Sequence, residues 1–228
     1  MNKIPFTSDQ FFGVFTAYNQ SIGWAAFLVY GGAAALVWLS LRPTRWSSRT
    51  LCFGLAALWL FTGTYYHLAH FTAVSPAGYL FGALFIVQSI LLVYAGIKRD
   101  LEFAPFSRLA RVIGALFLVY ALVFYPVIGL AFGERYPALP LFAAPCPLTI
   151  FTFGMLFWTR GRVPIRLLAV PVTWALIGSY AITEFGVVQD LVMPIAALTT
   201  TIFITRRNHT KANLRSRAMG TAPAASVL

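Results

Sequence analysis

Charged side chains are scarce in this sequence. Only 10% of its 228 residues are Asp, Glu, Lys or Arg, whereas a soluble domain contains about a quarter. Hydrophobic residues make up 59%, so there are too few polar residues to cover a folded domain in water. The same figures exclude a disordered chain, which combines low hydrophobicity with high net charge. The composition therefore predicts a protein that folds within a membrane.

Several motifs of well-known chemistry are missing. The sequence has no phosphate-binding GxxxxGK[ST] motif and no zinc-binding HExxH motif. The last apolar run has no lysine for a retinal Schiff base, and no row of intramembrane charges indicates ion-coupled transport. The two cysteines, Cys52 and Cys146, fall on opposite sides of the predicted membrane, about 30 Å apart, which excludes a disulfide. No set of nucleophile, base and orienting residue is visible, so the sequence favours a function other than an enzyme's.

Long apolar runs are what the sequence has instead. Seven runs have the length and composition of helices that cross a bilayer, without the alternation of a β-barrel. The predicted spans are residues 22–40, 51–71, 79–97, 112–132, 147–159, 164–183 and 188–205. The fifth is the weakest, because it spans only if residues 141–145 also lie at membrane depth. The sequence thus predicts an all-α membrane protein with seven transmembrane helices.

The basic residues indicate how these helices are oriented. Of the 17 Lys and Arg residues, 15 follow the first, third, fifth or seventh span, and only Lys3 and Arg135 lie on the other side. Basic loops stay in the cytoplasm, so the N-terminus is expected outside and the C-terminus inside. Because these charges lie in short loops beside the membrane, they predict contact with the lipid bilayer and no nucleic-acid partner.

This topology divides the chain into three segments. Residues 1–21 are predicted to form a periplasmic interfacial helix, residues 22–205 the seven-helix transmembrane domain, and residues 206–228 a basic, disordered cytoplasmic tail. In the first segment, Thr7 and Gln10 fit a capping box, and Phe6 and Phe11 fit a hydrophobic staple. The phenylalanines of this segment suit the headgroup region of the membrane, although a plain structured linker is the alternative.

Three residues at the predicted outer side form a candidate metal site. His67 and His70 are three residues apart, so on an α-helix they share a face and could hold one metal ion, or one of them could ligate a haem. Cys146 lies between two prolines at the start of the fifth span and could supply a soft thiolate ligand. The alternative is two interfacial histidines bonded to loops or water, and a cysteine that fits a tight turn. No cofactor is therefore assigned.

A second set of polar residues predicts a substrate pocket that faces outward. Glu184 and Asp190 flank the turn between the sixth and seventh spans, and His67 ends the second. With Gln88 and Tyr125, they are the candidate pocket residues. Prolines in three spans fall in the same half of the membrane, where kinked helices would line a cavity. The alternatives are a solvated turn for the two acids and interhelical hydrogen bonds for the deeper residues.

Several stretches between residue 5 and about residue 205 carry a family resemblance. They are Pro5–Thr7, Gln10–Phe11, Tyr18–Asn19, Trp59–Gly63, Tyr66–His67, Ser75–Ala77, Tyr79, Phe81–Gly82, Gln88, Tyr136–Pro137, Pro145–Pro147, Phe151–Thr152, Trp174–Gly178 and Asp190. Together they resemble a family of uncharacterised bacterial integral-membrane proteins whose members are sometimes labelled as permeases. The resemblance implies a multi-pass protein of the bacterial inner membrane, and it assigns no substrate and no catalytic residue. His70 fits the pattern less clearly than His67.

Three functions are compatible with these features. The first is permease-like transport or binding of a small solute through the outward pocket. The second is a metal- or haem-binding accessory membrane protein. The third is a structural or assembly subunit, in which the small residues 31–35 of the first span pack closely against a second copy or another membrane protein.

Overall fold

The structure, a computed structural model, describes residues 6–42, 44, 46–105 and 107–220, and side chains as far as residue 210. The described residues are mostly helical, as the sequence predicts. The elements are α1 (Ser8–Ile22), α2 (Ala25–Leu41), α3 (Ser47–Phe61), η1 (Thr62–Leu68), η2 (Phe71–Ala73), α4 (Ala77–Lys98), β1 (Glu102–Phe103), α5 (Arg108–Val119), η3 (Tyr120–Phe124), α6 (Tyr125–Ala131), α7 (Pro145–Phe157), β2 (Thr159–Arg160), α8 (Arg166–Phe185), η4 (Val188–Leu191) and α9 (Val192–Gly220). Here η1 and η3 are π-helical, and η2 and η4 are 3₁₀ turns.

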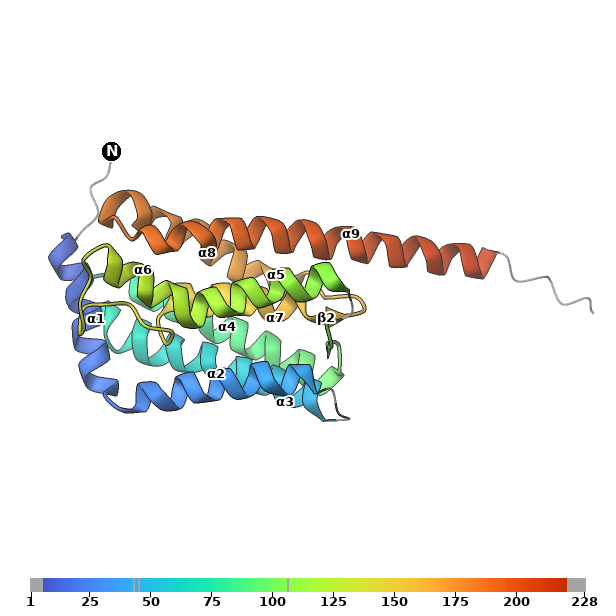
Figure 1. Cartoon of the computed structure of the whole chain (residues 1–228), viewed down its shortest axis with the longest axis horizontal. Coiled ribbons are helices and arrows are strands. Elements are labelled where there is room, and N and C mark those ends of the chain that lie inside the picture. The colour runs from blue at the N-terminus through green and yellow to red at the C-terminus, as the bar shows by residue number, and fades with distance from the viewer. Residues whose placement is uncertain (1–5, 43, 45, 106, 221–228) are drawn as a thin grey trace, which may run out of the picture.

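The long helices lie alongside one another, and α1 crosses one end of the bundle (Figure 1). Five helical segments of the described chain are long and apolar enough to cross a membrane: residues 47–73, 77–98, 108–131, 166–185 and 188–210. A sixth is added if α1 and α2, which are bent by 88° to each other, count as one span. The protein is thus an all-α protein with the helices of an integral membrane protein. Seven complete spans are not seen, because α2 has 17 residues and α7 has 13.

Helix α7 lies at the centre of the bundle. All its residues except Cys146 are buried, which fits a sequence that is apolar on every side. Its 13 residues span only about 20 Å, because residues 141–144 before it are not helical. That irregular segment is held by side chains: the Tyr18 hydroxyl donates to the Ala143 carbonyl (2.9 Å), and Tyr30 accepts from the Phe142 amide (3.0 Å). Irregular backbone is tolerated at such a depth when protein surrounds it.

Helix α1 begins with the predicted capping box. Thr7 Oγ1 accepts from the Gln10 amide, and Gln10 Oε1 accepts from the Thr7 amide at 2.8 Å. The predicted contact between Phe6 and Phe11 is also present, with ring centroids 6.4 Å apart. Asn19 attaches α1 to the loop before the irregular segment, since its Nδ2 donates to the backbone carbonyls of residues 137 and 139. Residues 1–5 of the predicted first segment lie outside the described residues.

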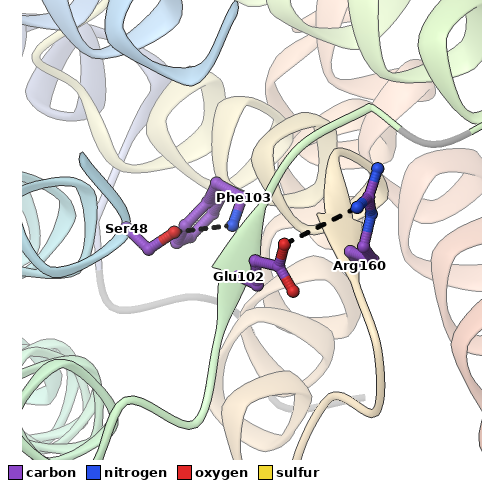
Figure 2. Close-up of polar contacts among 4 residues, drawn as sticks. All are labelled: Ser48, Glu102, Phe103 and Arg160. Atoms are coloured by element: carbon purple, nitrogen blue, oxygen red, sulfur yellow. Dashed lines mark hydrogen bonds and ion pairs between the residues drawn. The ribbon is translucent and has the colours of Figure 1, made fainter. Parts of the chain in front are cut away.

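The opposite end of the bundle carries eight of the 17 Lys and Arg residues, and we call it the basic end: residues 46–50, 98–105, 107–111 and 159–166. Strands β1 and β2 pair there in antiparallel fashion. Ser48 Oγ accepts a 2.9 Å hydrogen bond from the Phe103 amide, and Arg160 lies 3.8 Å from the Glu102 carboxylate (Figure 2). Asp100 pairs with Arg166. The start of α3, the segment after α4, and the segment from β2 to the start of α8 therefore meet at this end.

Helix α9 does not end at the predicted boundary between residues 205 and 206. It continues to Gly220 and extends past the rest of the bundle (Figure 1). Contacts with the loop after β2 account for part of this extension. Asn208 exchanges two hydrogen bonds with the Val163 backbone (3.1 and 2.8 Å), and Arg207 donates to the Thr159 carbonyl at 2.6 Å. Residues 221–228 of the predicted tail lie outside the described part of the chain.

Candidate functional site

A cavity of about 420 Å³ lies at the α1 end of the bundle, between α1, η1, η2 and the neighbouring ends of α4, α7 and α8. We call it the aromatic cavity. Its lining is Phe6, Phe11, Phe15, Tyr66, His67, Phe71, Ser75, Ala77, Phe81, Pro145, Cys146, Trp174, Ile177, Gly178, Tyr180, Ala181 and Phe185. Nine of these residues are aromatic, and none is Asp, Glu, Lys or Arg. The volume lies within the range of small-molecule sites.

His67 is fully buried in the wall of this cavity. Its ring packs edge-on against Phe85 and Trp174, with centroids 4.6 and 5.0 Å away. Neither ring nitrogen has a hydrogen-bond partner among the described residues, and Trp174 Nε1 makes no well-formed hydrogen bond there, although the weakly accepting Cys146 thiol lies beside it. Buried polar atoms are nearly always hydrogen-bonded, and each that is not costs about 1–3 kcal/mol. Three such atoms on two adjacent side chains need an explanation.

The backbone around His67 explains its position. Residues 62–68 continue α3 as a π-helix, which changes the direction of each following side chain relative to an α-helix. Gly63 and Gly82 allow η1 and α4 to approach closely: a Cβ at Gly63 would lie 2.8 Å from the Phe85 Cβ and 3.2 Å from the Gly82 carbonyl oxygen. This close approach brings His67 against the aromatic side chains of α4.

A cluster of buried and half-buried polar groups lies beside the cavity, and we call it the carboxyl cluster: the buried residues Tyr125, Gln189 and Asp190, and the half-buried Tyr120 and Glu134. Tyr125 donates a 2.5 Å hydrogen bond to Asp190, and both residues are buried. Gln189 Nε2 donates to both carboxylate oxygens of Glu134 (2.9 and 2.8 Å), and the Tyr120 hydroxyl donates to the Gln189 carbonyl (2.8 Å). The cluster joins η3 and α6 to η4 at the start of the last helix.

Two residues, Glu134 and Cys146, link the carboxyl cluster to neighbouring parts of the bundle. Burial raises the pKa of the Glu134 carboxyl, and the hydrogen bond from Gln189 partly offsets that rise. Gly129 makes room for the pair, because a Cβ there would collide with Glu134 and Leu139. The Cys146 side chain lies against the Asp190 carboxyl and also lines the aromatic cavity. Cys146 therefore contacts the carboxyl cluster and belongs to the wall of the aromatic cavity.

The structure brings some of the predicted pocket residues together and separates others. His67 lines the cavity, and Asp190 and Tyr125 form the centre of the carboxyl cluster. Gln88 is buried further along α4, where its Nε2 donates to the Leu167 carbonyl at 3.1 Å and joins α4 to α8. Glu184 is exposed on the last turn of α8 and lines no part of the cavity. Gln88 and Glu184 therefore lie outside the site.

The predicted metal ligands are not assembled. His70 lies after the end of η1, and both its ring nitrogens are occupied, by the Tyr65 carbonyl at 2.7 Å and the Ser21 hydroxyl at 3.0 Å. Within the described residues, no group of three or more His, Cys, Asp and Glu side chains could hold a metal ion. The expected shared face of His67 and His70 fails because η1 is not α-helical and ends at Leu68.

Two residues of the site were not predicted as site residues. Trp174 begins one of the stretches that carry the family resemblance, but the resemblance assigns it no role, and it is one of six tryptophans in an apolar chain. Gln189 is a polar residue in a short turn, where polar residues are ordinary. Both belong to the site because the fold places Trp174 against His67 and Gln189 against Glu134. The structural feature that marks the site is its two π-helical segments: η1 contains His67, and η3 ends just before Tyr125.

Comparison with known families gives a further observation. The model of DUF6064, a family of unknown function, matches residues 8–215. The chain belongs to this family. The match covers almost the whole described chain, so the aromatic cavity and the carboxyl cluster both lie within the DUF6064 region. No curated protein and no solved structure matches the chain.

Proposed function

We propose that this member of DUF6064 binds a small solute in the aromatic cavity and moves it in a permease-like manner. One observation carries the proposal: the cavity wall holds both ring nitrogens of His67 without a partner among the described residues, and Trp174 Nε1 with only the weakly accepting Cys146 thiol beside it. A bound molecule would supply the missing partners. A purely structural core would have no use for such atoms, because apolar side chains of the same shape are more stable there.

The proposal includes the finer topology that the charge pattern predicts. The chain would cross a bacterial inner membrane seven times, with α2 and the central helix α7 as the two shorter spans and the N-terminus outside. The basic end would then face the cytoplasm, since positively charged loops are retained there. The aromatic cavity would lie at the periplasmic side, close to the membrane surface, and would collect its solute from that side.

Thermal stabilisation of the purified protein by a panel of small solutes tests whether the cavity binds a ligand. A solute at 100 times its Kd should stabilise the folded state by about 2.7 kcal/mol. Ala181→Phe places a ring in the cavity and should abolish this stabilisation. Leu176→Phe, on the exposed face of the same helix, is the matched control and should leave it unchanged.

Uptake into proteoliposomes then separates transport from binding. A transported solute should accumulate with the wild type and the Leu176→Phe variant but not with Ala181→Phe. Stabilisation without uptake would show that the protein binds the solute but does not transport it, and would reject the permease-like role. A broad panel in which no solute stabilises the wild type would reject the proposal as a whole.

A second candidate function is that of an assembly subunit, and one surface favours it. On α2, Gly31, Gly32, Ala34 and Ala35 are exposed, and a Cβ added at either glycine would meet nothing within 4 Å. Exposed small residues let another helix approach closely in lipid. The mass of the protein in mild detergent tests this candidate. A complex that Gly31→Leu dissociates would support it, and a lone monomer would contradict it.

A further inference from the structure

The lining of the aromatic cavity selects against charge in its ligand. No lysine, arginine, aspartate or glutamate lines it, so an ion inside would lose its hydration without gaining a counter-charge. An anion would in addition lie near the carboxyl cluster, because Cys146 lines the cavity and lies against Asp190. The nine aromatic lining residues favour a flat apolar body, which can stack on ring faces and meet ring edges.

The unpartnered polar atoms define what else the ligand must carry. Trp174 Nε1 is a donor only, and the Cys146 thiol beside it is a weak acceptor, so a ligand that binds this N–H must carry a stronger hydrogen-bond acceptor. The imidazole of His67 in its neutral form offers one donor and one acceptor. A single carbonyl or hydroxyl oxygen near these two side chains would satisfy at least one of their three atoms, whereas a hydrocarbon would satisfy none of them.

The position of the cavity indicates the route of entry. Phe11 of α1 stacks on Phe185 of α8, with centroids 4.2 Å apart, and both line the cavity. Tyr180 lines it as well and is 51% exposed, so the cavity reaches the surface at α8. Leu176, one turn away on the same helix, is 71% exposed. A surface of this kind faces lipid, so a molecule dissolved in the bilayer could reach the cavity directly.

We propose that the aromatic cavity takes an uncharged, lipid-soluble molecule with a flat ring body and one carbonyl or hydroxyl oxygen, which hydrogen-bonds to Trp174 and His67. This inference rests on the proposed function and narrows it to one chemical class of ligand. It separates the site from those of permeases for ions and sugars, which need charged groups or many hydrogen-bonding side chains.

Four matched naphthalene probes test this class: 2-naphthol, naphthalene, 2-naphthoate and 2-naphthyl-trimethylammonium. Binding is measured by equilibrium dialysis on the full chain in lipid nanodiscs, with empty nanodiscs to subtract partitioning into lipid. We expect one saturable site for 2-naphthol, with an affinity at least about tenfold higher than for either charged probe. Ala181→Phe should abolish this binding, and Leu176→Phe should not.

The hydrogen bond has its own variant pair. Trp174→Phe keeps an aromatic ring but removes the donor, so it should weaken 2-naphthol about five- to tenfold and shift naphthalene much less. Trp38→Phe, at an exposed position of α2, should change neither affinity. Equal weakening of both probes by Trp174→Phe would show loss of packing alone and would contradict the hydrogen bond.

The outcomes also separate this inference from the proposed function. Binding of a charged probe as tight as that of 2-naphthol, blocked by Ala181→Phe, would overturn the ligand class and leave the cavity as a solute site. No saturable binding of 2-naphthol would overturn the inference, even if polar solutes stabilise the protein through the cavity. Binding of every ligand unchanged by Ala181→Phe would overturn both.

Discussion

The two ends of the bundle treat polar groups in opposite ways. At the basic end, the Glu102–Arg160 pair is 62% and 56% exposed, and the polar contacts join short loops at the surface (Figure 2). At the α1 end, Asp190, Gln189 and His67 are each no more than 1% exposed. Charge at the first end stays hydrated and costs little. Polar groups at the second end lose water, and only some of them regain hydrogen bonds.

The difference shows that the polar groups of the α1 end, and not those of the basic end, lower the stability of the fold. We expect the exposed contacts of the basic end to tolerate change, and the proposed topology would account for the basic residues there, because basic loops orient membrane proteins. The α1 end combines a buried carboxyl cluster with unpartnered polar atoms around a cavity. Buried ionisable and polar residues at membrane depth are expensive and are typical of functional sites. The following predictions, from the largest effect to the smallest, test this contrast.

Removal of a buried carboxyl should cost far more than removal of an exposed one. Asp190→Ala leaves the buried Tyr125 hydroxyl without its partner and should lower the free energy of unfolding by about 2–3 kcal/mol. Glu102→Ala should change it by no more than about 0.5 kcal/mol, because that pair is mostly exposed. Denaturant titration of the two variants in the same detergent measures both. Comparable losses would show that the two ends do not differ in this way.

The attachment of α1 should be the next most sensitive feature. Asn19→Ala removes two hydrogen bonds to backbone carbonyls and should lower the free energy of unfolding by about 1–2 kcal/mol. Because these two hydrogen bonds hold α1 against the bundle, their loss should also accelerate amide exchange in residues 8–22. Ser48→Ala removes one partly buried hydrogen bond at the basic end and should cost about half as much, with no effect on α1 exchange. Unchanged exchange in the Asn19 variant would contradict the proposed attachment.

The smallest effect should be a pH dependence that arises from Glu134. Burial raises its pKa above the ordinary value of 4.5 in the folded protein, so protonation favours the folded state. Its contribution to stability is complete below pH 4.5 and is lost as the pH rises through the raised pKa. The melting temperature of the wild type should therefore fall relative to Glu134→Gln as the pH rises, by on the order of 1 °C. Glu184→Gln, at an exposed position, should show no such trend, and a trend of opposite sign would contradict the assignment.

Features that depend on neighbouring residues in the chain could be predicted from the sequence. The capping box of Thr7 and Gln10 needs only a three-residue spacing, and it is present. The apolar runs fix five or six possible spans in the described chain, because their length is itself the signal. Helix α7 was the ambiguous case: a short run that is apolar on all sides fits a span and a buried central helix equally well.

The site itself could be predicted only in part. His67 and Asp190 are conspicuous in an apolar chain, and both belong to it. The pairing of His67 with His70 assumed 3.6 residues per turn, and the π-helical η1 changes that spacing. Trp174 is 107 positions away from His67, so their contact depends on the packing of α8 against α4. No local pattern encodes such a contact.

A structure of the protein with a bromine-labelled ligand tests the central claim most directly. The protein in lipid is incubated with 6-bromo-2-naphthol, and the bromine is located by anomalous diffraction. We predict one bromine site inside the aromatic cavity, in contact with its phenylalanine rings, with the naphthol oxygen within hydrogen-bond distance of Trp174 Nε1 or His67. Bromine only on the lipid-facing surface or at the basic end, with the cavity unchanged, would contradict the account.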